Sequence, residues 1–206
     1  MPTTLYLMRH GATVGNEEKR YKGSMDVPMS EYGVGQIKRA TEFVQATLRG
    51  SMLSAVYTSP LSRALKSAEI IAEPFGLTPV IMSDLRERDF GKWEGMTFSE
   101  ISQQYPDEFS AWAGNPLEHS PRGGESTLAV HDRVTAVLEL ILMRHAGDDN
   151  IAIAAHGGVN RIILCHIMNM PLDQIFRIEQ DNAAVNIITF YDKYPVVKLL
   201  NGGPIV

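Results

Sequence analysis

Ile151-Ala152-Ile153-Ala154-Ala155, followed directly by His156-Gly157-Gly158, is the stretch that decides the fold. Every residue of the first run is apolar, which is typical of a strand buried on both faces. Such strands occur in largely parallel sheets that helices cover on both sides. Other short β-favouring runs lie at 5–8, 55–57, 79–82, 185–190 and 196–200. The sequence therefore predicts an α/β fold, a three-layer sandwich with a mostly parallel central sheet flanked by helices.

Helical patterns with recognisable starts separate these strands. Side chains of Ser and Thr before an apolar-periodic segment are typical N-caps, and Glu three residues later completes a capping box. Helices are expected to begin at Ser30, at Thr97, at Ser126 and near residue 158. The stretch 105–124 is rich in proline and glycine, and we predict a long functional loop there. No repeat or linker divides the chain, so one domain is expected over 1–206.

The charge balance and the cysteine content disfavour several classes of protein. The 206 residues carry a net charge of −5, and no basic run exceeds Lys19-Arg20, which disfavours nucleic-acid and anionic-membrane partners. No apolar stretch approaches the roughly 20 residues of a membrane-spanning helix. Cys165 is the single cysteine and can form neither an internal disulfide nor a cysteine-based zinc site. A reducing compartment, with the cytoplasm as default, is therefore expected.

Charged and histidine residues follow the predicted strands. Arg9 and His10 follow the first strand, Arg63 the second, Glu87 the third and His156 the fourth. Ligands of open parallel sheets bind beyond the carboxyl ends of the strands, so these side chains are expected at one rim. Guanidinium groups match phosphate oxygens, and imidazole can attack phosphorus to give a phosphohistidine. This set of residues predicts a phosphate-binding site that also contains reactive groups.

Further residues fit such a site, whereas the motifs of other phosphoryl-transfer enzymes are missing. Asn16 can donate an amide hydrogen bond, and Gly23 and Gly157 allow close approach of the backbone to a ligand. The sequence holds no Gly-x-x-x-x-Gly-Lys-Ser/Thr loop, no arginine loop after Cys165, and no Asp-x-Asp pair or metal-ligand spacing. We therefore expect neither a metal ion nor another cofactor.

The segments around these residues resemble the histidine phosphatase superfamily, the phosphoglycerate-mutase-like proteins. The matching stretches extend to about residue 190 and comprise 7–16, 21–30, 58–64, 85–95 and 155–158. The resemblance implies the phosphoglycerate-mutase-like fold and metal-independent phosphatase activity through a phosphohistidine. It implies that His10 is the nucleophile, that Glu87 is the proton donor, and that the phosphoryl oxygens are held by Arg9, Asn16, Arg63 and His156.

Two segments indicate the subfamily. Residues 93–95 and 121–126 are similar to α-ribazole phosphatases and related broad-specificity phosphatases, with Arg122 as a substrate-binding candidate. Mutases usually carry an insertion with paired arginines, and this chain has no adjacent arginine pair. The expected partner is thus a small phosphorylated metabolite, such as α-ribazole phosphate or a sugar phosphate. A phosphoglycerate-type phosphomutase and a non-catalytic phosphate-binding regulatory module stay open, as does the choice between monomer and homodimer.

Overall fold

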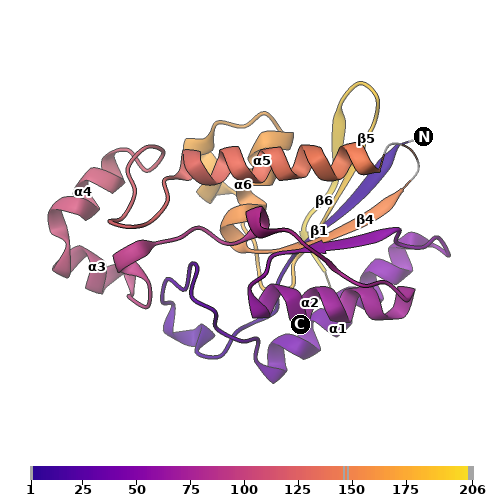
Figure 1. Ribbon diagram of the computed structural model, residues 1–206, viewed down its shortest axis with the longest axis horizontal. Helices are drawn as coiled ribbons and strands as arrows, with labels where there is room; N and C mark the ends of the chain where they lie inside the picture. Colours follow the sequence, from indigo (N-terminus) through magenta and orange to yellow (C-terminus); the bar gives the residue numbers. More distant parts are fainter. Residues whose placement is uncertain (1, 146, 148, 204–206) are drawn as a thin grey trace.

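The computed structural model describes residues 2–145, 147 and 149–203, and within them one six-stranded sheet forms the centre of the molecule (Figure 1). The strands are β1 (Thr3–Arg9), β2 (Ala55–Thr58), β3 (Val80–Ile81), β4 (Asn150–Ala155), β5 (Val185–Phe190) and β6 (Pro195–Gly202). They lie in the order β3-β2-β4-β1-β5-β6. The first four in this order are mutually parallel, whereas β5 is antiparallel to β1 and β6 to β5. The prediction of a mostly parallel central sheet is confirmed.

Helices cover both faces of the sheet. They are α1 (Glu31–Leu48), α2 (Ser62–Ala72), α3 (Phe98–Gln104), α4 (Pro106–Gly114), α5 (Thr127–Arg144) and α6 (Gly157–Ile167), with short 3-10 turns η1 (Asn16–Glu18), η2 (Glu73–Phe75), η3 (Ser83–Leu85), η4 (Gly91–Trp93) and η5 (Leu172–Arg177). In Figure 1, α5 and α6 lie on one side of the sheet and α1 and α2 on the other. The three layers follow from this arrangement.

The two halves of the core explain why β4 is apolar throughout. Ile151 and Ile153 pack with the residues of α5 and α6, whereas Ala152 and Ala154 face the residues of α1 and α2. Successive side chains of a strand point to opposite faces, so a strand covered on both sides needs an apolar residue at every position. Removing these surfaces from water is the main stabilisation of the sandwich.

The predicted helix starts are confirmed by their caps. The side chain of Ser30 accepts from the N–H of Gly33, and that of Ser126 accepts from the N–H of Ala129. Thr97 forms the complete capping box with Glu100. Each cap satisfies an N–H group that the helix itself leaves without a partner.

The prediction of a loop over 105–124 is wrong in its first half. Residues Pro106–Gly114 form α4, which packs beside α3 at one end of the molecule (Figure 1). Proline breaks a helix only in its interior, and at the first position its fixed φ favours helix formation. Asp107 and Glu108 follow in the first turn, where the helix dipole favours negative charge.

Within the described residues, no helix is long and apolar enough to span a bilayer.

Candidate active site

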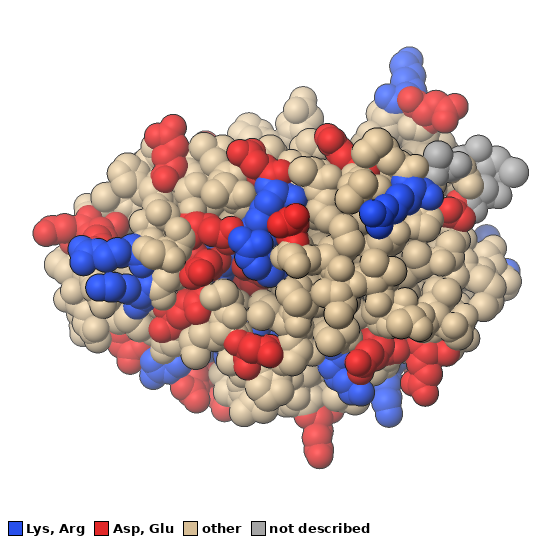
Figure 2. Space-filling view, in the orientation of Figure 1, with Lys and Arg blue, Asp and Glu red and all other residues tan. Residues whose placement is uncertain are grey.

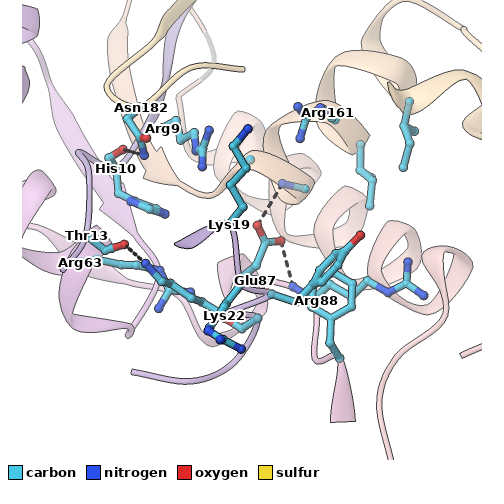
Figure 3. A pocket seen from close by; sticks show the side chains of 18 of the residues that line it. Arg9, His10, Thr13, Lys19, Lys22, Arg63, Glu87, Arg88, Arg161 and Asn182 are labelled. Carbon is cyan, nitrogen blue, oxygen red and sulfur yellow. Dashed lines mark hydrogen bonds between the residues drawn. The ribbon is translucent and has the colours of Figure 1, made fainter. Parts of the chain in front are cut away.

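A pocket of about 470 Å³ opens beyond the carboxyl ends of the parallel strands (Figure 3). The register of the sheet creates it, because Arg9 at the end of β1 pairs with Ala155 at the end of β4. His10 and His156, the next residues of each strand, are thereby neighbours although they are far apart in sequence. The lining includes seven of the nine residues predicted from the sequence: Arg9, His10, Asn16, Gly23, Arg63, Glu87 and Gly157.

His10 is a buried side chain that the backbone fixes on both sides. Its N–H donates to the carbonyl of Ala155 (3.0 Å), and its own carbonyl accepts from the N–H of Ala183 (3.1 Å). Nδ1 lies 2.7 Å from the carbonyl oxygen of Gly11. A carbonyl can only accept, so Nδ1 carries the proton and Nε2 keeps its lone pair.

The protonation state of His10 follows from its surroundings. Burial holds the pKa of His10 well below its ordinary value of 6.5, and the positive charges of Arg9 and Arg63 lower the pKa further. The imidazole is therefore uncharged at neutral pH. An uncharged ring with a free Nε2 is the nucleophilic form of histidine.

His156 lies behind the pocket lining, against the ring of His10. The ring centroids are 5.2 Å apart in an edge-to-face arrangement, and His156 is fully buried. Neither of its ring nitrogens has a hydrogen-bond partner among the described residues. Burial is the main cause that holds the pKa of His156 well below 6.5, and repulsion from His10, when that ring is protonated, and from Arg63 lowers it further. A buried polar ring without a protein partner beside the nucleophile is suited to contact a ligand oxygen.

The buried Arg63 and the half-buried Arg9 are anchored through backbone carbonyls. Arg63, in the first turn of α2, donates from Nη1 to Met25 O and from Nη2 to Gly23 O, each at 2.6 Å. Arg9 donates from Nη1 to Gln180 O, and its Nε has no partner among the described residues. Burial lowers the pKa of both guanidinium groups, which stay charged at any ordinary pH because arginine titrates so high. Fixed forks of this kind match phosphate oxygens.

Gly23 supplies one of these anchors from a backbone conformation that side chains rarely adopt. Its φ is +46°, and a Cβ at this position would lie 2.3 Å from Glu94 Oε1 and 2.8 Å from Arg88 O. Glycine is thus required both for the turn and for the close approach of neighbouring groups. The role of Gly23 is to orient the carbonyl that holds Arg63.

Glu87 faces the pocket from the loop that follows η3. Its Oε2 accepts from the N–H of Gly158 in the first turn of α6 (3.0 Å), and its Oε1 accepts from the N–H of Arg88 (2.9 Å). In Figure 3 its carboxyl group lies across the pocket from the ring of His10, leaving space between them. A carboxyl group facing a nucleophile across a cavity can transfer a proton to or from a ligand held between the two.

Arg133, on α5, fixes the loop that carries Glu87, and sequence reasoning did not single it out. Its guanidinium group donates to the carbonyls of Asp84 (2.8 Å), Arg86 (2.8 Å) and Glu87 (3.3 Å). It also binds both carboxylate oxygens of Glu125 at 2.8 Å, and Glu125 in turn accepts from nearby loop groups. Its place on an amphipathic helix gave no local sign of this role.

Arg122 lies outside the pocket, so the structure does not place it where the sequence predicted. Its side chain is exposed and pairs with Glu108 of α4 at 3.0 Å. The folding of Pro106–Gly114 into a helix brings this acidic partner next to the arginine. Substrate binding by Arg122 stays a prediction.

The pocket is cationic although the protein is acidic overall. Seven arginine and lysine residues line it but only one acidic residue, Glu87. On the outer face drawn in Figure 2, by contrast, basic and acidic side chains are interspersed. Five of the basic lining residues were not among the predicted site residues: Lys19, Arg20, Lys22, Arg88 and Arg161. Within the described ranges, no group of three His, Cys, Asp or Glu side chains is placed to hold a metal ion.

Comparison with known proteins agrees with this geometry. The model of the histidine phosphatase superfamily (branch 1) matches residues 5–202, which is nearly the whole chain. The chain belongs to this superfamily. Phosphoserine phosphatase 1 of Hydrogenobacter thermophilus is 30% identical to this histidine phosphatase over 197 residues, covering 96% of this chain and 91% of the relative.

Two further relatives extend the comparison. The adenosylcobalamin/α-ribazole phosphatase of Escherichia coli is 26% identical, with 96% of this chain and 95% of the relative covered. The solved structure of Bacillus stearothermophilus YhfR superposes with a TM-score of 0.85 at 32% identity, covering 96% of both chains. This histidine phosphatase is thus a phosphomonoester hydrolase, and the resemblance to α-ribazole phosphatases is confirmed.

Proposed function

We propose that the protein hydrolyses phosphomonoesters of small metabolites in the cytoplasm, through a phosphohistidine on His10 and without a metal ion. One observation carries the proposal: the Nδ1 hydrogen bond of His10 leaves Nε2 free, and Arg63 and Arg9, one buried and one half-buried, lie close enough to lower the pKa of this ring. The nucleophile and the charges that would hold a phosphate are thereby in place before a ligand arrives. Such preorganisation is the main source of rate in phosphoryl transfer.

In the first step, His10 Nε2 attacks phosphorus and the bond from phosphorus to the ester oxygen breaks. Glu87 in its protonated form gives its proton to that oxygen, so the product leaves as a neutral alcohol. The guanidinium groups of Arg9 and Arg63, together with Asn16, bind the equatorial oxygens. His156, uncharged beside His10, donates a further hydrogen bond from its ring N–H.

In the second step, water attacks the phosphorus of the phosphohistidine and the bond from phosphorus to Nε2 breaks. Glu87, now a carboxylate, takes the proton of that water and returns to its starting form. Phosphate leaves and His10 regains its free Nε2. The two steps balance, and every proton passes through Glu87.

The metabolite is a small one, such as α-ribazole phosphate or a sugar phosphate, because a pocket of about 470 Å³ suits a molecule of that size. The relatives named above act on small phosphorylated compounds by their names, phosphoserine and α-ribazole phosphate. We propose that the outer part of the pocket, away from His10, selects the leaving group.

The test is phosphate release from a panel of metabolite phosphates in the presence of a chelator. We expect the wild type to keep its activity and His10→Ala to lose at least about a thousandfold in kcat. His166→Ala is the matched control, because His166 is an exposed histidine outside the pocket lining. Full activity in His10→Ala, or loss of wild-type activity on chelation, would contradict the mechanism.

Trapping the intermediate gives a second test. Substrate labelled in the phosphoryl group, followed by rapid denaturation, should leave label on the wild type that is stable to base and released by acid. Peptide mapping should locate it at His10. Faster isomerisation of 3-phosphoglycerate than release of phosphate would instead identify a mutase.

A further inference from the structure

Not all of the positive charge in the pocket is needed for a phosphate beside His10. Lys22 donates to Thr13 Oγ1 (2.6 Å) and Val14 O (2.9 Å), and Arg20 pairs with Glu18 and Glu100. Arg88 is likewise held, by Glu125 O and Thr127 Oγ1. The side chain of Lys19 and the Nη atoms of Arg161 have neither a hydrogen-bond partner nor an ion-pair partner among the residues that the structure describes.

Arg161 is held in a fixed orientation next to Arg9. Its Nε donates to Ile178 O at 2.7 Å, which restrains the guanidinium plane and leaves the Nη atoms free. A Cβ built on Gly157 would lie 3.4 Å from Arg161 Nη1 and 3.3 Å from Arg9 Nε. Two guanidinium groups therefore flank the same glycine, at the N-terminus of α6, without a carboxylate between them.

Like charges this close repel each other, and an anion between them removes the repulsion. Burial is the main cause that lowers the pKa of Arg9, and the charge of Arg161 lowers it further, whereas the charges of Glu87 and Asp181 raise it. The charge of Glu87 offsets part of this repulsion, but its carboxylate accepts from the N–H groups of Gly158 and Arg88 and forms no ion pair with either guanidinium group within the described residues. The protein thus provides a place for a negative charge that its own described side chains do not fill.

The side chain of Lys19 points to a part of the pocket away from the place of a phosphate beside His10. In Figure 3 the side chain of Lys19 extends toward the side of the pocket where Arg9 and Arg161 lie, and away from Arg63. Arg161 lies on the far side of Arg9 from His10 in the same view. A phosphate beside His10 would therefore use Arg9 and Arg63, whereas Arg161 and Lys19 face the group attached to it.

We propose that Arg161 and Lys19 form a second anion subsite, which selects phosphomonoesters whose leaving group carries a carboxylate or a second phosphate. This inference rests on the proposed function and narrows its substrate class. It predicts that phosphates of uncharged sugars bind less well than phosphorylated hydroxy acids or bisphosphates of similar size. The planar fork of Arg161 suits either anion, and Lys19 adds a point charge.

Pairs of substrates that differ in one anionic group provide the test. 3-Phosphoglycerate and glycerol phosphate differ by a carboxylate against a hydroxymethyl group, and fructose 1,6-bisphosphate and fructose 1-phosphate differ by a second phosphate. The measured quantity is the ratio of kcat/KM within each pair, at low ionic strength because salt screens exposed charges. The wild type should prefer the doubly charged member of at least one pair about tenfold or more, and the pair that shows this preference identifies the second anion.

Variants test whether Arg161 and Lys19 cause the preference for the doubly charged substrate. Arg161→Gln should reduce the ratio about tenfold, and Lys19→Gln about threefold, with little change for p-nitrophenyl phosphate. Lys19→Gln is the decisive variant, because Arg161 also holds Ile178 O and its loss could displace that loop. Arg39→Gln, an exposed arginine of α1 outside this pocket, is the matched control and should keep both ratios.

Equal kcat/KM within both pairs for the wild type, or ratios that both variants leave unchanged, would overturn the proposal. Hydrolysis of p-nitrophenyl phosphate separates this outcome from failure of the proposed function. If that activity depends on His10 while the ratios do not depend on Arg161 or Lys19, the mechanism stands and the second anion subsite is wrong. If that activity does not depend on His10, the proposed function fails first.

Discussion

Acidification should destabilise this protein through the two buried histidines of the site. Burial and the neighbouring positive charges hold the pKa values of His10 and His156 well below 6.5 in the folded state. In the unfolded chain both rings titrate near their ordinary value. Below about pH 6.5, the unfolded chain therefore binds protons that the folded protein does not, so the free energy of unfolding decreases as the pH falls.

The size of the effect follows from this difference in proton uptake. Each ring contributes up to about 1.4 kcal/mol per pH unit between its unfolded and its folded pKa. Between pH 7 and pH 5.5 this amounts to about 1 kcal/mol for one ring and about 2 to 3 kcal/mol for the pair. The contribution is fully present above pH 6.5 and is lost on acidification, which is opposite to the behaviour of a histidine that gains an acidic partner.

Urea unfolding at pH 7.0 and pH 5.5, in phosphate-free buffer of constant ionic strength, measures the loss. Carboxylates titrate in the same range, so the informative quantity is the difference between variants. His10→Gln should lose about 1 kcal/mol less than the wild type between the two pH values. His166→Gln, which replaces an exposed histidine, should lose as much as the wild type. An equal loss in His10→Gln and the wild type would refute the argument that this ring is held uncharged.

Three further predictions concern single side chains. Arg63→Met should lower kcat/KM for p-nitrophenyl phosphate about 100-fold or more, because it removes an anchored charge beside the nucleophile. Gly23→Ala should lower the free energy of unfolding by about 2 to 4 kcal/mol in urea titrations, since φ is +46° and Cβ would meet Glu94 Oε1. Arg133→Lys should lower kcat/KM more for alkyl phosphates than for p-nitrophenyl phosphate, whose leaving group needs little help from Glu87.

Matched variants separate these effects from general damage. Arg122→Met removes an exposed arginine outside the pocket and should leave kcat/KM within about twofold. Gly76→Ala places a Cβ at φ +64° with no atom within 4 Å, so it should cost only about 1 kcal/mol. An equal fall of kcat/KM for both kinds of substrate in Arg133→Lys would instead indicate that the loop that carries Glu87 has lost its fold and not only its alignment.

Much of the fold could be predicted because its signals are local or periodic. The run Ile151–Ala155 is apolar at each position because both faces of β4 are covered, and the helix starts are marked by Ser30, Thr97 and Ser126. The loop prediction over 105–124 failed because proline content does not distinguish a helix interior from its first turn. That distinction depends on the residues around each proline, and here Asp107 and Glu108 favoured the helix.

The strand pattern predicts the part of the candidate site that adjoins the ends of strands, and the family resemblance adds Asn16 and Gly23. Arg9, His10 and His156 follow β1 and β4 directly, so the parallel sheet brings them together whatever the loops do. Arg161 and Lys19 belong to a helix and a turn whose orientation depends on distant contacts, such as the bond from Arg161 to Ile178 O. In the sequence, Arg161 is a basic residue on an apolar helix, and no neighbouring residue distinguishes it from a solvated one.

The cations of the pocket act on both the ligand and the nucleophile. Burial, followed by the charges of Arg9 and Arg63, lowers the pKa of His10 in the free protein, which keeps Nε2 unprotonated. A bound phosphate dianion neutralises these charges, so the field that disfavours a proton on the ring is reduced once the ligand is present. In the proposed mechanism, the ring takes on positive charge as the bond from Nε2 to phosphorus forms, and the phosphoryl oxygens next to it would stabilise that charge. The ligand would thereby supply the compensation that the imidazole lacks beforehand, so a depressed histidine pKa is compatible with a mechanism that places charge on the same ring.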